Sequence, residues 1–133
     1  MAFDITWEPR GLVRRYWGDV TIAERRESFE QIFADPRFDE LQFTITDYLD
    51  VRQYEITSEA TEEIAALHIG AVQTNPRILI AAVATDARVI EAIQHFIQLD
   101  MTPSPYRIFS SVADARAWIA QAQRPPLPRA PRL

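Results

Sequence analysis

A group of acidic and tyrosine residues follows an alternating apolar segment in the run FTITDYLDVRQYE, residues 43–55. Clusters of this kind just past the end of a strand are where α/β proteins often keep a binding or catalytic site. We therefore interpret the stretch after residue 46 as a loop that engages a partner or a ligand. Its candidate residues are Asp47, Tyr48, Asp50, Tyr54 and Ser58.

The carboxylates of this stretch are of the type that hold a hard cation, because Ca²⁺ and Mg²⁺ prefer several oxygen ligands. Asp47, Asp50 and Glu55 lack the spacing and the glycine turn of an EF-hand, and the sequence supplies no nucleophile or oriented base beside them. We assign no metal ligand and no catalytic residue. A metal-dependent enzyme that uses the segment from Asp47 to Glu55 is kept as the least favoured alternative.

The composition excludes several other kinds of chemistry. The chain of 133 residues contains no cysteine, no lysine and only three glycines. Thiolate nucleophiles, Schiff-base lysines and glycine-rich phosphate loops are therefore ruled out, and no cofactor is expected. The net charge of -5 argues against nucleic acid as a partner, because binding it requires a basic surface.

Hydrophobic and charged residues make up 47% and 25% of the chain, the proportions of an ordinary globular protein. The N-terminus lacks the features of a signal peptide, and the most apolar run, residues 78–84, has the length of a strand. These features predict a cytoplasmic protein without membrane insertion. We predict a single domain over residues 1–123 and a flexible tail rich in proline and arginine over residues 124–133.

The elements that position the candidate loop can be predicted from periodicity, turn residues and helix caps. Helices are predicted to begin at or just after Thr21, Ser58, Asp86 and Ser111. Strands are predicted over residues 3–8, 11–18, 41–46, 77–85 and 106–109. The order is β-β-α-β-α-β-α-β-α. Because β-α-β connections are right-handed, it predicts an α/β fold with a single mixed, mostly parallel five-stranded sheet and helices mainly on one face.

Alternation along the strands and helices predicts which side chains meet the helical layer. Phe43 and Ile45 are expected to lie on the face that the helices cover, with Thr44 and Thr46 on the opposite face. In the first helix, Arg25 is expected on the solvent-facing side.

Aromatic residues gather in the predicted opening hairpin, where the sequence has Trp7, Tyr16 and Trp17. They either pack beneath the helices or form an exposed patch at the edge of the sheet. The second interpretation makes these residues a candidate self-association surface, through which two copies form a homodimer. His68 lies on the apolar stripe of its helix and is interpreted as a packed histidine.

Three short runs within this order of elements are similar to SpoIIAA-like domains of the STAS superfamily: GDVT (residues 18–21), DYLD (residues 47–50) and NPRILIAAVATD (residues 75–86). The resemblance covers residues 3–122 and is to a divergent subgroup of uncharacterised bacterial proteins. STAS domains occur in anti-sigma-factor antagonists and in the cytoplasmic parts of sulfate transporters. The resemblance implies a SpoIIAA-like fold and a non-enzymatic regulatory module that works through contacts with a protein partner.

The resemblance has one departure and one extension. Regulatory STAS domains place a phosphorylatable serine in an Asp-Ser-Ser-Gly turn after the third strand, where this chain has YEITSE, residues 54–59. The nearest hydroxyls, those of Thr57 and Ser58, are interpreted as helix caps. The subgroup has also been compared with lipid-binding CRAL-TRIO domains. An alternative function is therefore a carrier or sensor of a small apolar or amphipathic ligand, held in a pocket between the sheet and the helices.

Overall fold

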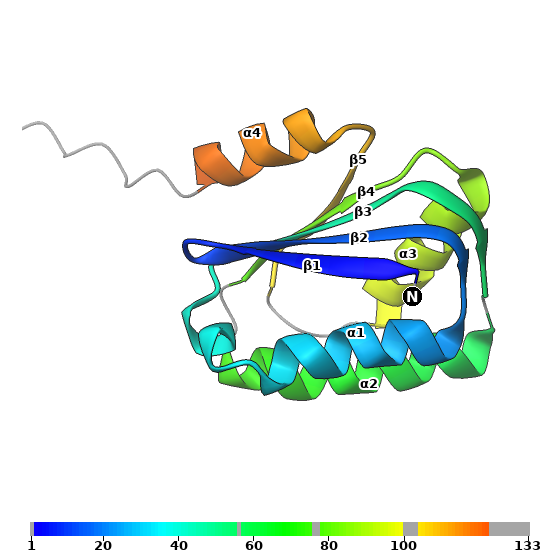
Figure 1. Ribbon diagram of the computed structural model, residues 1–133, viewed down its shortest axis with the longest axis horizontal. Helices are drawn as coiled ribbons and strands as arrows, with labels where there is room; N and C mark the ends of the chain where they lie inside the picture. The colour runs from blue at the N-terminus through cyan, green and yellow to red at the C-terminus, as the bar shows by residue number, and fades with distance from the viewer. Residues whose placement is uncertain (1, 56, 76–77, 100–103, 123–133) are drawn as a thin grey trace, which may run out of the picture.

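The computed structural model contains one five-stranded sheet in the order β1-β2-β3-β4-β5 (Figure 1). β1 pairs with β2 in the antiparallel direction, and each later pairing is parallel. The strands are β1 (Phe3–Glu8), β2 (Gly11–Val20), β3 (Phe43–Tyr54), β4 (Leu79–Val83) and β5 (Tyr106–Phe109). The structure describes residues 2–55, 57–75, 78–99 and 104–122. The predicted mixed, mostly parallel sheet is confirmed.

Helices α1, α2 and α3 lie on one face of this sheet, and α4 lies on the opposite face (Figure 1). Their bounds are Ile22–Ala34, Ser58–Thr74, Ala87–Leu99 and Val112–Ala122. The first three connect neighbouring parallel strands, and right-handed connections between such neighbours place their helices on the same side. α4 follows the last strand and is free of that constraint. The prediction of helices mainly on one face is confirmed.

Side-chain caps fix several helix starts where the sequence predicts them. The hydroxyl of Thr21, the carboxylate of Asp86 and the hydroxyl of Ser111 accept hydrogen bonds from amides two or three residues later, at 3.2, 2.8 and 3.1 Å. At the far end of α1, Asp35 caps the short 3₁₀ helix η1 (Pro36–Glu40). These bonds satisfy amides that have no partner within their own helix.

The two faces of β3 are covered differently from the prediction. Phe43 and Ile45 are buried, but they pack against α4 and not against the three-helix layer. Thr44 and Thr46 line a cavity beneath that layer instead. Alternation identifies the apolar side of a strand without showing which helices cover it. On the threonine side, the buried hydroxyl of Thr46 is satisfied by Arg14, which donates a hydrogen bond of 3.0 Å to it.

The turn between β1 and β2 needs its glycine for packing and not for backbone conformation. The left-handed φ of this turn, 61°, belongs to Arg10. Gly11 is buried with the ring of Phe43 lying against it, so a Cβ atom at Gly11 would overlap that ring. This contact joins the tip of the hairpin to the start of β3.

No helix in the described ranges is both long and apolar enough to cross a membrane. The predicted tail, residues 124–133, lies outside the described residues. The domain boundary at residue 123 therefore stays a prediction.

Candidate functional site

The segment predicted as an acidic loop is the second half of β3, so the loop prediction was wrong. Pairing with β2 continues from Asp47, opposite Arg15, to Tyr54, opposite Val20. Two register shifts interrupt this pairing, and at each of them β3 has one residue more than β2. Gly18 of β2, with a φ of 64°, lies at the second shift. Such irregularities rotate the following side chains and remove the strict alternation by which a strand is predicted. The sequence of this segment therefore resembles that of a loop, although its backbone is still paired in the sheet.

The three acidic residues of this segment bind three separate partners. Asp47 accepts a hydrogen bond of 2.9 Å from the amide two residues ahead, and Asp50 lies 2.6 Å from the guanidinium of Arg15. Glu55 accepts a hydrogen bond of 2.9 Å from the first amide of α1. Nowhere in the described ranges do three histidine, aspartate or glutamate side chains group as a metal site requires. The cation site considered for these acids is not formed by them.

Of the two tyrosines of the segment, Tyr48 belongs to the protein interior and Tyr54 is partly buried beside it. Tyr48 is 6% exposed and stacks on Tyr16 at 5.5 Å between ring centroids, and Tyr54 packs edge-on against Tyr48 at 5.6 Å. Burial raises the pKa of the Tyr54 hydroxyl well above its ordinary value, which keeps it neutral near pH 7. The burial of Tyr48 argues against a direct contact with a partner, and its predicted role in binding stays a prediction.

Arg25 joins this aromatic group from α1, and its predicted place on the solvent-facing side was wrong. The residue is 5% exposed. Its guanidinium lies 4.4 Å from the centre of the Tyr54 ring and donates a hydrogen bond of 3.1 Å to the Glu55 carbonyl. Arg25 of α1 thus anchors the end of β3, although its charge led to the prediction that it faces solvent.

Exposed residues of the segment meet exposed residues of β2. Leu49 is 41% exposed and Asp50 is exposed, while Asp47 is partly buried. Arg15 is exposed and lies over the ring of the partly buried Trp17, at 5.2 Å from its centre. We call these five residues the β3 surface. It combines an apolar side chain, an indole and an ion pair.

The remaining candidates of the segment stay open. Ser58 is the first residue of α2, and its side chain lies outside the described part of the chain. Thr57 is exposed. The role of Ser58 in binding a partner or a ligand stays a prediction.

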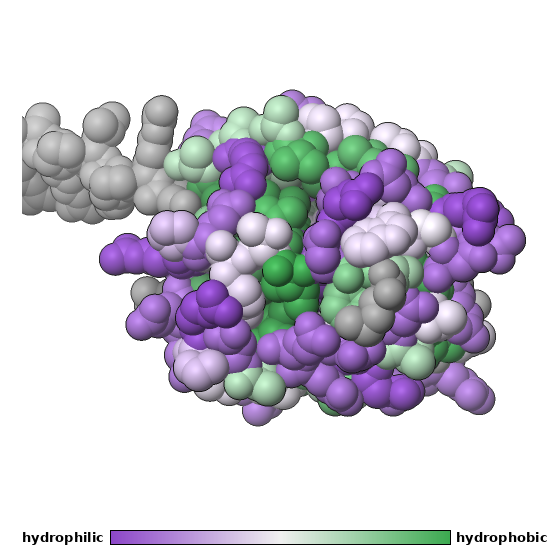
Figure 2. Space-filling model, viewed as in Figure 1, coloured by the Kyte–Doolittle hydropathy of each residue, from purple (hydrophilic) through white to green (hydrophobic). Residues whose placement is uncertain are grey.

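The hairpin aromatics divide between the interior and the surface. Tyr16 is 1% exposed, so its burial argues against a place in a self-association surface, and its predicted role stays a prediction. Trp7 is partly buried, and the guanidinium of Arg37 covers its ring at 4.2 Å. Figure 2 shows hydrophobic residues in a strip between this hairpin and α1. Self-association through Trp7 and Trp17 stays a prediction.

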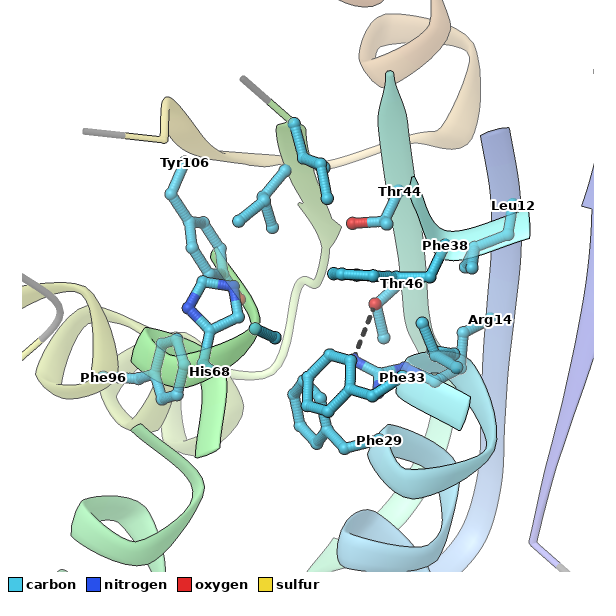
Figure 3. A pocket seen from close by; sticks show the side chains of 14 residues that line it. Leu12, Arg14, Phe29, Phe33, Phe38, Thr44, Thr46, His68, Phe96 and Tyr106 are labelled. Atoms are coloured by element: carbon cyan, nitrogen blue, oxygen red, sulfur yellow. Dashed lines mark hydrogen bonds between the residues drawn. The ribbon is translucent and has the colours of Figure 1, made fainter. Parts of the chain in front are cut away.

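A cavity lies on the other side of β2 and β3, between the sheet and the three-helix layer (Figure 3). Its volume is about 40 Å³. Its wall is mostly apolar, and the phenylalanines in it are Phe29, Phe33, Phe38 and Phe96. In Figure 3, the side chains of Tyr106 and His68 lie across the cavity from those of Thr44 and Thr46.

His68 and Tyr106 form the far wall as packed rings. His68 is 7% exposed, and its ring lies 5.3 Å from that of Phe96, which confirms the prediction of a packed histidine. Tyr106 lies 5.8 Å from the same phenylalanine, and burial raises the pKa of its hydroxyl well above the ordinary value. The tyrosine is therefore a neutral hydroxyl in this wall.

Arg14 is the charged group of the cavity, and it did not figure among the predicted candidates. It is 6% exposed, and its guanidinium lies 4.4 Å from the centre of the Phe29 ring. Nη1 donates to the Ser28 hydroxyl and Nη2 to the Thr46 hydroxyl, both at 3.0 Å. Within the described part of the chain, Nε has no acceptor and no carboxylate pairs with this guanidinium.

Ser28 holds this arrangement together from α1. Its hydroxyl donates to the Arg25 carbonyl at 2.8 Å, lies 2.5 Å from the Tyr16 hydroxyl and accepts from Arg14. One hydroxyl has a single donor and two acceptor sites, so these bonds use its whole capacity. The sequence carried a signal for the arginine, since Arg14 is in phase with the buried Leu12 and Tyr16 along β2.

No protein-family model matches the sequence, and no curated protein matches it. Among solved structures, the chain is similar to that of the anti-sigma factor antagonist SpoIIAA in its unphosphorylated form. The TM-score is 0.61 at 7% sequence identity, over 90% of this chain and 98% of the other. At this identity the likeness shows the fold alone. The chain has a SpoIIAA-like fold, as the sequence resemblance implied.

Proposed function

From the SpoIIAA-like fold, we propose that this chain is a non-catalytic regulatory module that binds a partner protein through the β3 surface. Its structural neighbour is named as an antagonist of an anti-sigma factor, a role defined by its action on another protein. A partner of the same general kind, a folded protein, suits the mixed apolar and charged character of the β3 surface.

The assignment as non-catalytic is supported by how the acidic residues are used. Asp47, Asp50 and Glu55 are each committed to a backbone amide or to Arg15. A catalytic acid or base needs a substrate within reach and a neighbour that activates or orients it. These carboxylates instead stabilise the end of β3 and the start of α1.

The observation that carries the proposal is the exposure of Leu49 beside Trp17 and the Arg15–Asp50 ion pair. Across the described residues, Leu49 and Leu67 are the exposed large hydrophobic side chains, at 41% and 37%. Leu67 stands on α2, whereas Leu49 lies next to an indole and a charged pair, the composition found at interface centres and rims.

Site-specific photo-cross-linking in the native host tests this proposal. Leu49 is replaced by the photoreactive residue benzoylphenylalanine, and Leu67 is replaced in the same way as a matched control of similar exposure. We expect a discrete protein adduct from position 49 and none from position 67. Leu49→Asp combined with cross-linking from Trp17 should lose the same adduct, because a carboxylate would be desolvated in the interface.

The mass of the adduct also identifies the class of partner. An adduct of two chains would make a second copy the partner and would support the homodimer. Equal adducts at positions 49 and 67, or none at position 49 in a folded chain, would contradict an interface at the β3 surface.

A further inference from the structure

The buried guanidinium of Arg14 is supported only by neutral groups. It donates to two hydroxyls and lies over aromatic rings, which together provide fewer acceptors than its N–H groups can use. A buried charge is normally paired, because removing it from water is costly unless an opposite charge compensates. In the described ranges Arg14 has no such partner, although the chain carries an excess of acidic residues.

The missing counter-charge coincides with a cavity. Arg14 lines the space between the sheet and the three-helix layer, and its Nε is buried without an acceptor among the described residues. Arginine binds carboxylates in a bidentate manner through adjacent N–H groups, and a carboxylate reaches the covered Nε of Arg14 once the side chains around it shift. The polar groups nearest to it, Ser28 and Thr46, are already engaged by Nη1 and Nη2.

The other residues of the cavity wall indicate which chemical groups a ligand must carry besides its anionic group. Phe33, Phe38, Phe96 and Ile80 offer apolar and aromatic surface, and the polar remainder is limited to hydroxyls and His68. A free inorganic anion would leave this surface without a partner. The cavity volume of about 40 Å³ favours a small ligand.

We propose that this cavity binds a small organic carboxylate, whose anionic group pairs with Arg14 and whose apolar part packs among the phenylalanine rings. This inference is independent of the β3 surface, which lies on the other side of the same strands. It also gives a chemical class, an organic carboxylate, to the small ligand considered from the sequence.

Calorimetric titration of the purified full chain with defined probes tests the proposal. The probes are butanoate, hexanoate and benzoate, with benzamide as the neutral analogue of benzoate. We expect at least one carboxylate to bind and raise the melting temperature, and benzamide to bind about tenfold more weakly or worse, because it lacks the charge-assisted hydrogen bonds.

Variants locate the binding. Arg14→Met removes the charge at similar length and should abolish carboxylate binding, whereas Arg15→Met, the adjacent arginine on the outer side, should leave it unchanged. Ala71→Phe fills the cavity while keeping Arg14 and should also abolish binding, which keeps the test valid if Arg14→Met fails to fold. The proposal is overturned if no carboxylate of the series binds at millimolar concentration, if benzamide binds as well as benzoate, or if Ala71→Phe binds normally.

Discussion

Arg14 and Arg15 are adjacent in β2, but they lie on opposite sides of the sheet in very different surroundings. Arg15 is exposed and forms an ion pair of 2.6 Å with Asp50. Arg14 is 6% exposed and is held by the hydroxyls of Ser28 and Thr46, with no ion pair inside the described ranges. The paired arginine is therefore the one in water, and the unpaired arginine is the one in the interior.

This difference is the reverse of what stability alone would favour. An exposed pair such as Arg15–Asp50 contributes about 0–1 kcal/mol, whereas burying a charge costs several kcal/mol unless it is compensated. A residue that carries such a cost inside a cavity is a candidate for binding. The outer arginine instead contributes charge and shape to the β3 surface, through which we propose that the chain binds a partner protein.

Charge reversal at the two positions should give the largest difference. Arg14→Glu places an uncompensated carboxylate in the interior and should lower the free energy of unfolding by about 3–5 kcal/mol at pH 7. Arg15→Glu, the matched control, should lower it by about 1 kcal/mol or less, through repulsion with Asp50 in water. Urea unfolding followed by circular dichroism measures both values.

The direction of the pH effect provides a check on Arg14→Glu. Burial raises the pKa of a carboxyl group, so the folded variant binds a proton more readily than the unfolded chain. Its stability should therefore recover as the pH falls. Similar losses for Arg14→Glu and Arg15→Glu would show that the two positions are equally solvated and would remove the contrast between them.

Replacing Arg14 by a neutral residue should change the free energy of unfolding in the opposite direction. Without ligand, Arg14→Met should raise the free energy of unfolding by about 1–4 kcal/mol, because methionine fills similar space without a buried charge. Arg15→Met should change it by about 1 kcal/mol or less. Thermal and urea unfolding at pH 7 measure the two differences. A clear loss of stability in Arg14→Met would mean that its hydrogen bonds to Ser28 and Thr46 outweigh its desolvation.

Removing the Ser28 hydroxyl, which Arg14 and Tyr16 share, should change the free energy of unfolding somewhat less. Ser28→Ala leaves the Tyr16 hydroxyl and one donor of Arg14 without their acceptor in a buried region, which should cost about 1–3 kcal/mol. Ser110→Ala, at an exposed serine, should stay within about 0.5 kcal/mol. Equal unfolding midpoints for the two variants would show that water enters and replaces the Ser28 hydroxyl.

Most of the fold could be predicted because its elements follow strong local rules. Thr21, Asp86 and Ser111 cap helices where the sequence predicts starts, and the order of strands and helices determines the three-helix layer. The face of β3 could not be predicted in the same way. Phe43 and Ile45 lie under α4, and no rule of connection places a helix that follows the last strand.

The candidate site was predicted less well for two physical reasons. The register shifts between β2 and β3 removed the alternation after residue 46, so strand residues, including the buried Tyr48, were assigned to a loop. Charge also led to the expectation that Arg25 faces solvent, whereas Arg25 and Arg14 stack on aromatic rings in the interior. Their position in phase with buried neighbours was the better signal.

The smallest expected effect concerns the ion pair between Arg37 and Asp35, which lies at the protein surface as the Arg15–Asp50 pair does. The guanidinium and amide of Arg37 lower the pKa of Asp35 from 3.8 to about 2. Because the folded state holds this carboxylate ionised, its contribution to stability is complete above pH 3.8 and is lost as the pH falls through about 2.

Asp35→Asn keeps a side-chain oxygen for the cap but removes the charge. Its unfolding midpoint should be below that of the parent at pH 5 and should converge with it near pH 2. Asp39→Asn removes an exposed carboxylate from the same 3₁₀ helix and is the control, with an expected change of about 0.5 kcal/mol or less at pH 5. A constant offset for Asp35→Asn across this range would show that the charge of Asp35 does not stabilise the folded state.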